Sequence, residues 1–220
     1  MKKSLVAGSM LAAAVASVAS AGFTGYSVQR TVTVAGNIQY QIFANWDTAN
    51  LVFLNAFNFA TQSGSMGARH QDTFTAEGET GTWQAGPAVL LADRAEDSWV
   101  TASGSASSSS WGSALDPGFA NGGQIQNINN GAGWYDATPG TPNPISAGGT
   151  QGGYRILLAQ IVRSGGTDDS IATFYLKHAY KVAGTTTALF SEGTFSIGVV
   201  PAPGAMALLG VAGLAGRRRR

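Results

Sequence analysis

The chain has no cysteine, only two histidines, and charged side chains at just 11% of its residues. Without cysteine it can form no disulfide, offer no thiol nucleophile and bind no metal through sulfur, so its stability must come from an apolar core. Between residues 22 and 196, no window combines a sustained 3.6-residue apolar period with helix caps. The absence of this pattern argues against a helical domain.

Positive charge is scarce in the middle of the chain. Of the 13 lysines and arginines, six lie in the first three and the last four residues, which leaves seven basic residues against 12 acidic ones in residues 22–196. The formal net charge of this part is therefore −5. Such a balance argues against nucleic acid and anionic lipid head groups as partners.

The first 21 residues have the order of parts of a secretory signal peptide. Two lysines precede an apolar stretch from Leu5 to Val18, and Ala19 and Ala21 form an A-x-A cleavage site. An uncleaved membrane anchor is the alternative, although the apolar stretch is short and rich in alanine and serine. We therefore expect export, with a mature chain that begins at Gly22.

The last 24 residues, 197–220, form a segment that we call the tail. Twenty uncharged residues from Ile197 to Gly216 precede four arginines. Pro201 and Pro203 disfavour a helix before them, so a helix is expected from residue 204 onward. Thirteen residues then give about 20 Å, short of the roughly 30 Å hydrocarbon core unless the proline segment lies in the interface. Adjacent arginines resist translocation and stay cytoplasmic, which favours a transmembrane helix over a core element followed by a nucleic-acid-binding end.

The tail resembles the PEP-CTERM sorting signal of exported bacterial proteins. The matching residues are the sorting motif Val200, Pro201, Ala202, Pro203 and Gly204 and the basic stop Arg217, Arg218, Arg219 and Arg220. The chain departs from the family pattern at Ala202, where the family has glutamate. The resemblance implies an exosortase-like intramembrane sorting protease as a partner. It also implies a protein that is held in the membrane by its tail and then located at the cell surface or outside the cell.

The residues between these two ends read as β-strands. Val28, Val32 and Val34 alternate with mostly polar residues, and Gly36 with Asn37 predicts a hairpin turn. The stretch Leu51–Phe59 is too apolar for a surface strand and contains two asparagines. It predicts a buried central strand, bulged at an asparagine, with a helix as the less favoured alternative.

The second half contains the two strongest strand patterns, Tyr154–Arg163 and Ile171–Val182, which we expect to be joined as a hairpin through Gly165–Asp169. A last strand is expected over Ala188–Ile197. Shorter candidates lie at Thr73–Ala76, Thr80–Gln84, Ala88–Leu91 and Asp97–Ala102. About ten short strands predict an all-β fold, an antiparallel β-sandwich of the jelly-roll or immunoglobulin kind. The expected organisation is a signal peptide (1–21), a sandwich ectodomain (22–196) and the tail (197–220), with a helix at each end.

Residues 103–153 differ in composition from the rest of this ectodomain. Ser103–Ser110 is a low-complexity serine segment, and Gly131–Gly153 is rich in glycine and proline, so long surface loops are expected. Apolar residues between them are expected to hold this excursion against the body: Trp111, Leu115, Phe119, Ile125, Ile128, Trp134 and Tyr135. The apolar strand Leu51–Phe59, with Asp97–Thr101 and Leu115–Phe119, also resembles exported β-rich domains of planctomycete-like bacteria, for which no activity is implied.

The two histidines are the main candidates for catalysis. His70 lies in a loop, and alternation places His178 on the same strand face as Leu176 and Tyr180. Nucleophilic hydrolysis would need either histidine beside a serine and a carboxylate, and no G-x-S-x-G motif is present. We therefore predict no catalytic residue, no cofactor and no enzymatic activity, with a secreted hydrolase as the second alternative function.

Two acidic clusters could offer oxygen ligands to Ca²⁺. They are Asp93–Asp97 and Asp168–Asp169, and neither matches a Ca²⁺-loop pattern, so both are interpreted as solvated turns and no metal site is predicted. Glu77 and Glu79 share one face of a predicted strand, where a glycosidase pair would need a facing cleft.

Five tryptophans suggest a different kind of site. Trp83 and Trp99 are expected in the core, whereas Trp111 and Trp134 are the candidates for stacking on sugar rings. The sequence thus predicts a structural or adhesive protein of the cell surface or extracellular matrix. The alternative is a carbohydrate-binding module with exopolysaccharide as its partner.

Overall fold

The structure is a computed structural model that describes residues 22–65, 83, 96–102, 113–116, 119, 132–136, 143–144, 146–147, 153–163 and 170–198. These residues form strands and turns, and none of them is helical. The strands are β1 (Phe23–Val32), β2 (Ile38–Trp46), β3 (Leu51–Ser63), β4 (Trp99–Val100), β5 (Ser113–Leu115), β6 (Gly133–Asp136), β7 (Asn143–Pro144), β8 (Ser146–Ala147), β9 (Tyr154–Arg163), β10 (Ala172–Val182) and β11 (Leu189–Ile197).

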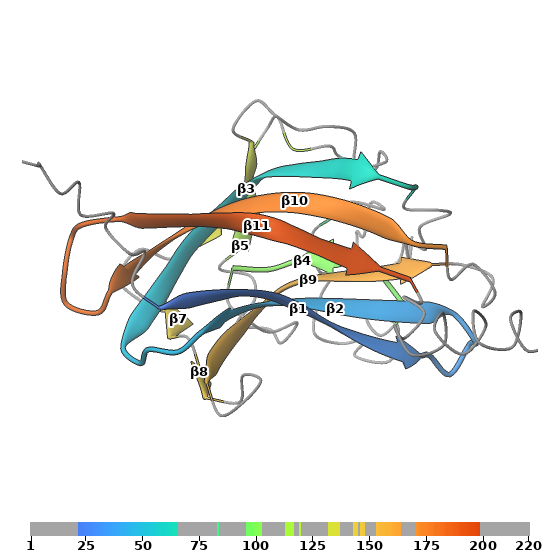
Figure 1. The fold of residues 1–220 in the computed structure, drawn as a ribbon, viewed down its shortest axis with the longest axis horizontal. Helices are drawn as coiled ribbons and strands as arrows, with labels where there is room; N and C mark the ends of the chain where they lie inside the picture. Colours follow the sequence, from blue (N-terminus) through green and yellow to red (C-terminus); the bar gives the residue numbers. More distant parts are fainter. Residues whose placement is uncertain are drawn as a thin grey trace, which may run out of the picture.

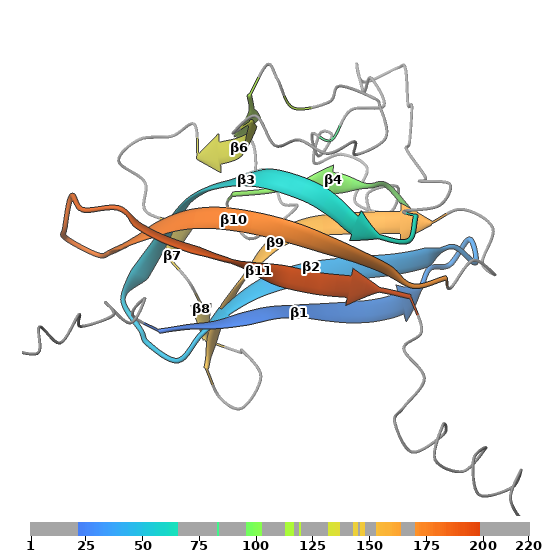
Figure 2. The same ribbon diagram turned by 45° about the horizontal axis from the view of Figure 1, so that its top comes forward.

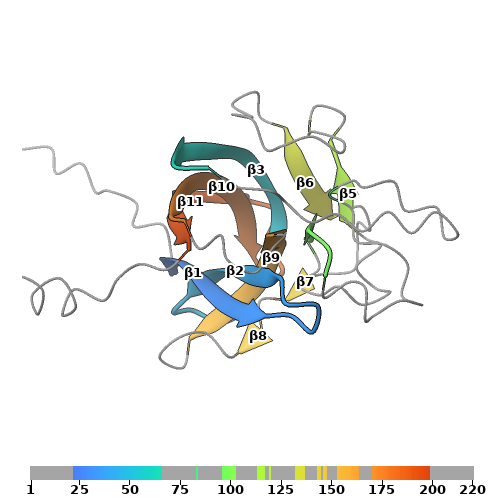
Figure 3. The same cartoon turned by 90° about the vertical axis from the view of Figure 1, so that its right-hand side faces the viewer.

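The strands form two antiparallel sheets (Figure 1). The first sheet has the order β1-β2-β9-β4, with β8 also paired to β9. The second has the order β11-β10-β3-β6-β5, with β7 also paired to β3. Seen from one end, the long strands of the two sheets form two layers, an arrangement consistent with a β-sandwich (Figure 3). The all-β prediction is thus confirmed for the part of the chain that is described.

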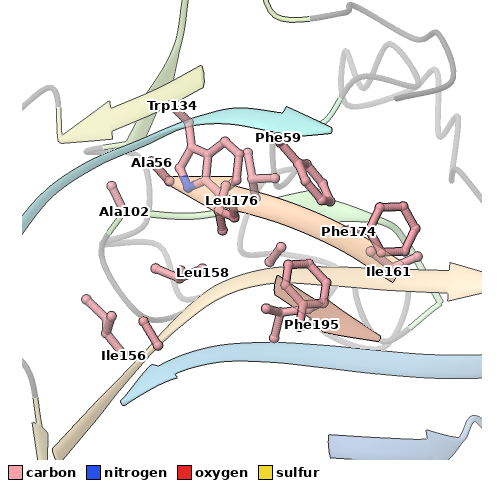
Figure 4. Packing of buried hydrophobic residues seen from close by; sticks show 14 of the residues in the cluster. Ala56, Phe59, Ala102, Trp134, Ile156, Leu158, Ile161, Phe174, Leu176 and Phe195 are labelled. Atoms are coloured by element: carbon pink, nitrogen blue, oxygen red, sulfur yellow. The ribbon is translucent and has the colours of Figure 1, made fainter. Parts of the chain in front are cut away.

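A single apolar core lies between the layers. It draws on both sheets, with Leu158 and Ile161 from the first and Phe174 and Phe195 from the second, all of them buried (Figure 4). Burial of each large apolar side chain contributes about 1.5–3 kcal/mol, which lets the fold persist without disulfides. Trp83 belongs to this core and Trp99 is likewise buried, as predicted.

Strand β3 confirms the expectation of a buried and irregular central strand. It lies between β10 and β6, and six of its apolar residues are buried. Asn58 has a φ of 54°, a conformation that asparagine tolerates better than most residues. The pairing with β10 shifts register in the same stretch, between the partners of Tyr175 and Lys177. The bulge at an asparagine is therefore present, at Asn58.

The predicted hairpin of the first strands is also present, but its apolar end is not buried. Val32 pairs with Ile38 at the last rung of the β1–β2 ladder. Val32 and Val34 are both exposed. The alternating valines predicted one inward face, yet only the start of β1 packs against the core.

The connection between β9 and β10 corrects a prediction. These strands were expected to pair as a hairpin, but β9 pairs with β2 and β4 in the first sheet, whereas β10 pairs with β3 and β11 in the second. The two strands therefore lie in different layers. The buried guanidinium of Arg163 donates to the carbonyl oxygens of Ser170 (2.6 Å) and Ser65 (2.7 Å), which ties the end of β9 to the second sheet.

Candidate functional site

One candidate site is a buried histidine within an aromatic cluster. His178 of β10 is fully buried, and five rings from both sheets surround it. Their centroids lie 4.7–6.1 Å from that of the imidazole. This His178 cluster consists of His178 with Phe23, Tyr26, Trp46, Phe53 and Tyr180. The predicted alignment of His178 with Leu176 and Tyr180 is confirmed, since all three are buried.

A hydrogen-bonded pair fixes the orientation of this imidazole. The hydroxyl of Tyr26 donates to the carbonyl oxygen of Leu176 (3.0 Å) and lies 2.7 Å from Nδ1 of His178. Because a hydroxyl has a single proton, we infer that Nδ1–H donates to the Tyr26 oxygen. In that tautomer Nε2 is a bare acceptor, and it has no hydrogen-bond partner among the described residues.

The same burial keeps this pair uncharged. Burial lowers the pKa of His178 to about 3, so the imidazole is neutral at physiological pH. Burial also raises the pKa of Tyr26, which keeps its hydroxyl protonated. A neutral histidine enclosed by aromatic rings and bonded to a tyrosine is not arranged as the general base of a hydrolase. His178 is best understood as a structural histidine.

The second candidate is a groove on the molecular surface at β10 and β11. It has a volume of about 420 Å³ and is lined by Phe23, Lys177, Phe190, Ser191 and Glu192. We call it the β10–β11 groove. Lys177 and Glu192 are cross-strand partners on neighbouring strands of the second sheet. The alternation of side chains along a strand places them on the face opposite to His178.

Charged and hydroxyl groups at this groove hold one another in place. Nζ of Lys177 lies 3.4 Å from Oε2 of Glu192, and the hydroxyl of Tyr175 donates to the same oxygen at 2.7 Å. The Tyr175 hydrogen bond, with help from Lys177, lowers the pKa of Glu192 below its usual value. Partial burial and the bond to Glu192 raise the pKa of Tyr175 to about 12. Glu192 is therefore a carboxylate, and Tyr175 a neutral donor, across the physiological range.

An exposed aromatic ring completes the groove. Phe190 is 56% exposed, and its ring packs edge-on against Phe57 with centroids 6.4 Å apart. The ammonium of Lys177 lies 6.0 Å from the centroid of each ring. The groove thus combines an exposed aromatic residue with a carboxylate and an ammonium. This combination could bind a ligand that has both apolar and hydroxyl surfaces.

One predicted glycan contact must be corrected. Trp134 lies in β6 with 0% of its side chain exposed, and its Nε1–H donates to the carbonyl oxygen of Thr101 at 3.0 Å. Its ring packs against Phe59 and Phe119, so it offers no face to a sugar. The expected role of Phe119 and Trp134 in holding the excursion against the body is confirmed. The other candidate, Trp111, lies outside the described residues.

Of the described acidic residues of the Asp93–Asp97 cluster, Asp97 is buried, contrary to the prediction of a solvated turn, whereas Glu96 is half-buried. The carboxylate of Asp97 is buried and accepts from the backbone N–H of Ser98 at 2.8 Å. Glu96 binds the β1–β2 turn through three hydrogen bonds. No group of three or more potential metal ligands occurs in the described part of the chain. His70, Glu77, Glu79, Asp168, Asp169, the signal peptide with Ala19 and Ala21, and the tail motif from Val200 to Arg220 lie outside it.

Sequence patterns did not identify the groove residues, because each of them, taken alone, is an ordinary strand residue. The signal that could have identified them is the hairpin of β10 and β11, whose short turn sets Lys177 opposite Glu192. Once that register is known, each outward-facing residue of β10 can be matched with its partner on β11.

Comparison of the chain with protein-family models, with curated proteins and with solved structures found no match. Among the residues that the structure describes, there is no helix able to span a bilayer.

Proposed function

We propose that the chain is an exported surface protein. In this proposal, residues 1–21 direct export, a β-sandwich is the functional body, and the tail holds it in the membrane for an exosortase-like sorting protease. The role of the body is structural or adhesive at the cell surface or in the extracellular matrix. A jelly-roll or immunoglobulin-like topology, with a helix at each end of the chain, belongs to the same proposal.

The observation that carries this proposal is where the folded body begins and ends. Strand β1 starts at Phe23, directly after the predicted first mature residue, and β11 ends at Ile197, where the tail begins. Apart from Ile197, which the predicted tail shares with β11 and which is buried in the core, neither predicted targeting segment takes part in the described sheets. An export signal and a membrane tail are both free to act when they flank a body of this kind.

Cell fractionation tests the proposal. The full chain, expressed in a bacterium that has an exosortase, should be found in the membrane or outer-surface fraction and should be accessible to added protease in intact cells. The matched variant replaces Arg217–Arg220 by alanine and leaves the body unchanged. It should lose membrane retention because the basic stop is absent. A wild-type chain that remains cytoplasmic would refute the proposal.

A second function, glycan binding, is favoured by the β10–β11 groove. Sugar rings have apolar faces that stack on aromatic rings and hydroxyls that bond to charged groups, and the groove presents Phe190 beside Glu192 and Lys177. Its volume lies within the range of small-molecule sites. This proposal moves the glycan contact from Trp134 to Phe190.

Binding to exopolysaccharide purified from the producing cells tests this second function. Phe190→Ala and Glu192→Gln should each weaken retention in an affinity gel that contains the polysaccharide. Tyr135→Ala is the matched control, since Tyr135 is an exposed aromatic residue of β6 that does not line the groove. Equal retention of all three variants and the wild type would exclude the groove as the binding site.

A further inference from the structure

The start of the tail and the β1–β2 hairpin lie at the same end of the molecule. The ends of β1, β3 and β11 and the starts of β2 and β10 lie together at the right of Figure 1, and Figure 2 shows the same grouping. The pairing agrees. Val32 pairs with Ile38, and Ile38 pairs with Arg163, whose guanidinium donates to Ser170. We call this the tail-proximal end.

Three of the six large exposed apolar side chains of the described residues lie at the tail-proximal end. Val34 at the hairpin tip is fully exposed, Val32 is 55% exposed, and Ile171 is 44% exposed. Ile171 directly precedes Ala172, the partner of Ile197 at the end of β11, so it lies where the chain passes into the tail. The other three lie elsewhere: Tyr135 is on β6, and Val182 and Phe190 are at the far end of the β10–β11 pair.

The hairpin tip is held in a fixed shape although its valines have no core to pack against. The carboxylate of Glu96 accepts from the hydroxyl of Thr33 (2.6 Å), the backbone N–H of Ala35 (3.1 Å) and the amide of Asn37 (3.0 Å). Residues 31–37 contain no charged side chain. The tip's own side chains carry no charge, and the Glu96 carboxylate beside it is engaged in these three hydrogen bonds, so its exposed valine is suited to an apolar surface rather than to open water.

The chain itself limits how far this end can lie from the tail. Six residue steps separate Gly198, the last described residue, from Gly204, where the apolar tail segment begins. Fully extended, six steps reach about 20 Å. If the tail is inserted in a bilayer, the tail-proximal end must therefore stay close to the lipid surface.

We propose that the tail-proximal end rests on the lipid bilayer, with Val34 and Val32 of the hairpin tip in the interfacial region. The inference depends on the membrane tail in the function proposed above. Lipid is the occupant because the tether holds this end near the bilayer and the valines of the hairpin tip are exposed there. The net charge of −5 in residues 22–196 favours a zwitterionic rather than an anionic surface.

The absence of cysteine makes a direct test practical. Two single-cysteine variants of the full chain, Val34→Cys and Thr186→Cys, are labelled with an environment-sensitive nitrobenzoxadiazole fluorophore and reconstituted in phosphatidylcholine vesicles. Thr186 is the matched control, because it is an exposed loop residue between β10 and β11 at the opposite end. Flotation measures vesicle association, and quenching by aqueous iodide measures burial of each label.

The proposal predicts that the label at position 34 shifts its emission to shorter wavelength and is quenched several-fold less than the label at position 186. Chains that float with the vesicles but show equal quenching at both positions would overturn this inference and leave the membrane tail intact. Chains that do not float would overturn both proposals. Protection of position 34 without vesicles would assign the tip to a second copy of the chain, and would likewise overturn the inference.

Discussion

The hydroxyl of Tyr26 on β1 lies 2.7 Å from Nδ1 of His178 on β10, and this contact joins the two sheets within the core. The same hydroxyl donates to the carbonyl oxygen of Leu176 at 3.0 Å. Leu176 stands at the register shift of β10 against β3, where it has no paired residue on β3. The register shift of β10 against β3 and the hydrogen bond across the core therefore both involve Leu176.

Replacing Tyr26 by phenylalanine tests the value of this bond. The variant keeps the ring contacts but removes the partner of both His178 and Leu176, so we expect the free energy of unfolding to fall by about 1–3 kcal/mol. Urea denaturation followed by tryptophan fluorescence would measure the change.

Tyr175→Phe is the control. It removes a hydroxyl that bonds only to Glu192 at the surface, and it should cost less than about 0.5 kcal/mol. Equal losses in the two variants would contradict this account.

The depressed pKa of His178 predicts a stability that depends on pH. In the unfolded chain this imidazole binds a proton near pH 6.5, whereas in the fold its pKa is about 3. Between these values only the unfolded chain binds the proton, so stability is greatest above about pH 7. It is lost as the pH falls, by up to about 1.4 kcal/mol per pH unit.

Denaturant titrations between pH 7 and pH 5, above the range of most carboxylates, would measure this slope. His70→Gln should retain the slope that comes from His178, and His178→Leu should lack it. A wild-type free energy of unfolding that stays constant over this range would show that His178 can be protonated within the fold.

Much of the strand content could be predicted from the sequence, because the residues that specify these strands are neighbours in the chain. Leu51–Phe59 is almost continuously apolar and interrupted by asparagine, and it became the buried, bulged strand β3. The turn at Gly36 and Asn37 likewise separated β1 from β2. In each case the residues that decide the structure are neighbours in the chain.

The arrangement of strands in space could not be predicted in the same way. Tyr154–Arg163 and Ile171–Val182 have apolar patterns alike enough to suggest a hairpin, yet they belong to different sheets because β2 and β3 supply their partners. Trp134 suggested a surface residue because glycine and proline surround it, but an acceptor on distant Thr101 and the rings of Phe59 and Phe119 bury it. The candidate groove also depends on cross-strand register, which composition does not reveal.

The close approach of β6 to β3 predicts that Gly133 cannot be replaced. A Cβ atom at this position would collide with the backbone carbonyl oxygen of Ala56. We expect Gly133→Ala to lower the free energy of unfolding by about 1–3 kcal/mol, because β6 must move away from β3. Gly193→Ala on β11 is the matched control. Its Cβ would meet the Tyr26 ring at 3.4 Å and the Phe23 ring at 3.9 Å, both ordinary contacts, and it should be neutral or stabilising by up to about 1 kcal/mol. A harmless Gly133→Ala would contradict the observed packing.

Glu96 should control the order of the hairpin tip. Glu96→Ala removes the acceptor for Thr33, Ala35 and Asn37, so the amide hydrogens of residues 33–37 should exchange with solvent faster while those of β9 stay protected. Hydrogen exchange followed by mass spectrometry would resolve the two regions. Glu192→Gln, another change at a surface carboxylate, should leave exchange at the tip unaltered. Unchanged exchange in Glu96→Ala would mean that the tip does not depend on Glu96.

The central claim is that the two ends of the chain are targeting signals that flank an exported β-rich domain. The most direct test is the intact mass of the mature protein recovered from bacteria that have an exosortase. The account predicts a chain that begins at Gly22 and ends near Pro203, while the variant with Arg217–Arg220 replaced by alanine accumulates with its tail still attached. A wild-type mass that includes every residue from Met1 to Arg220 would contradict it.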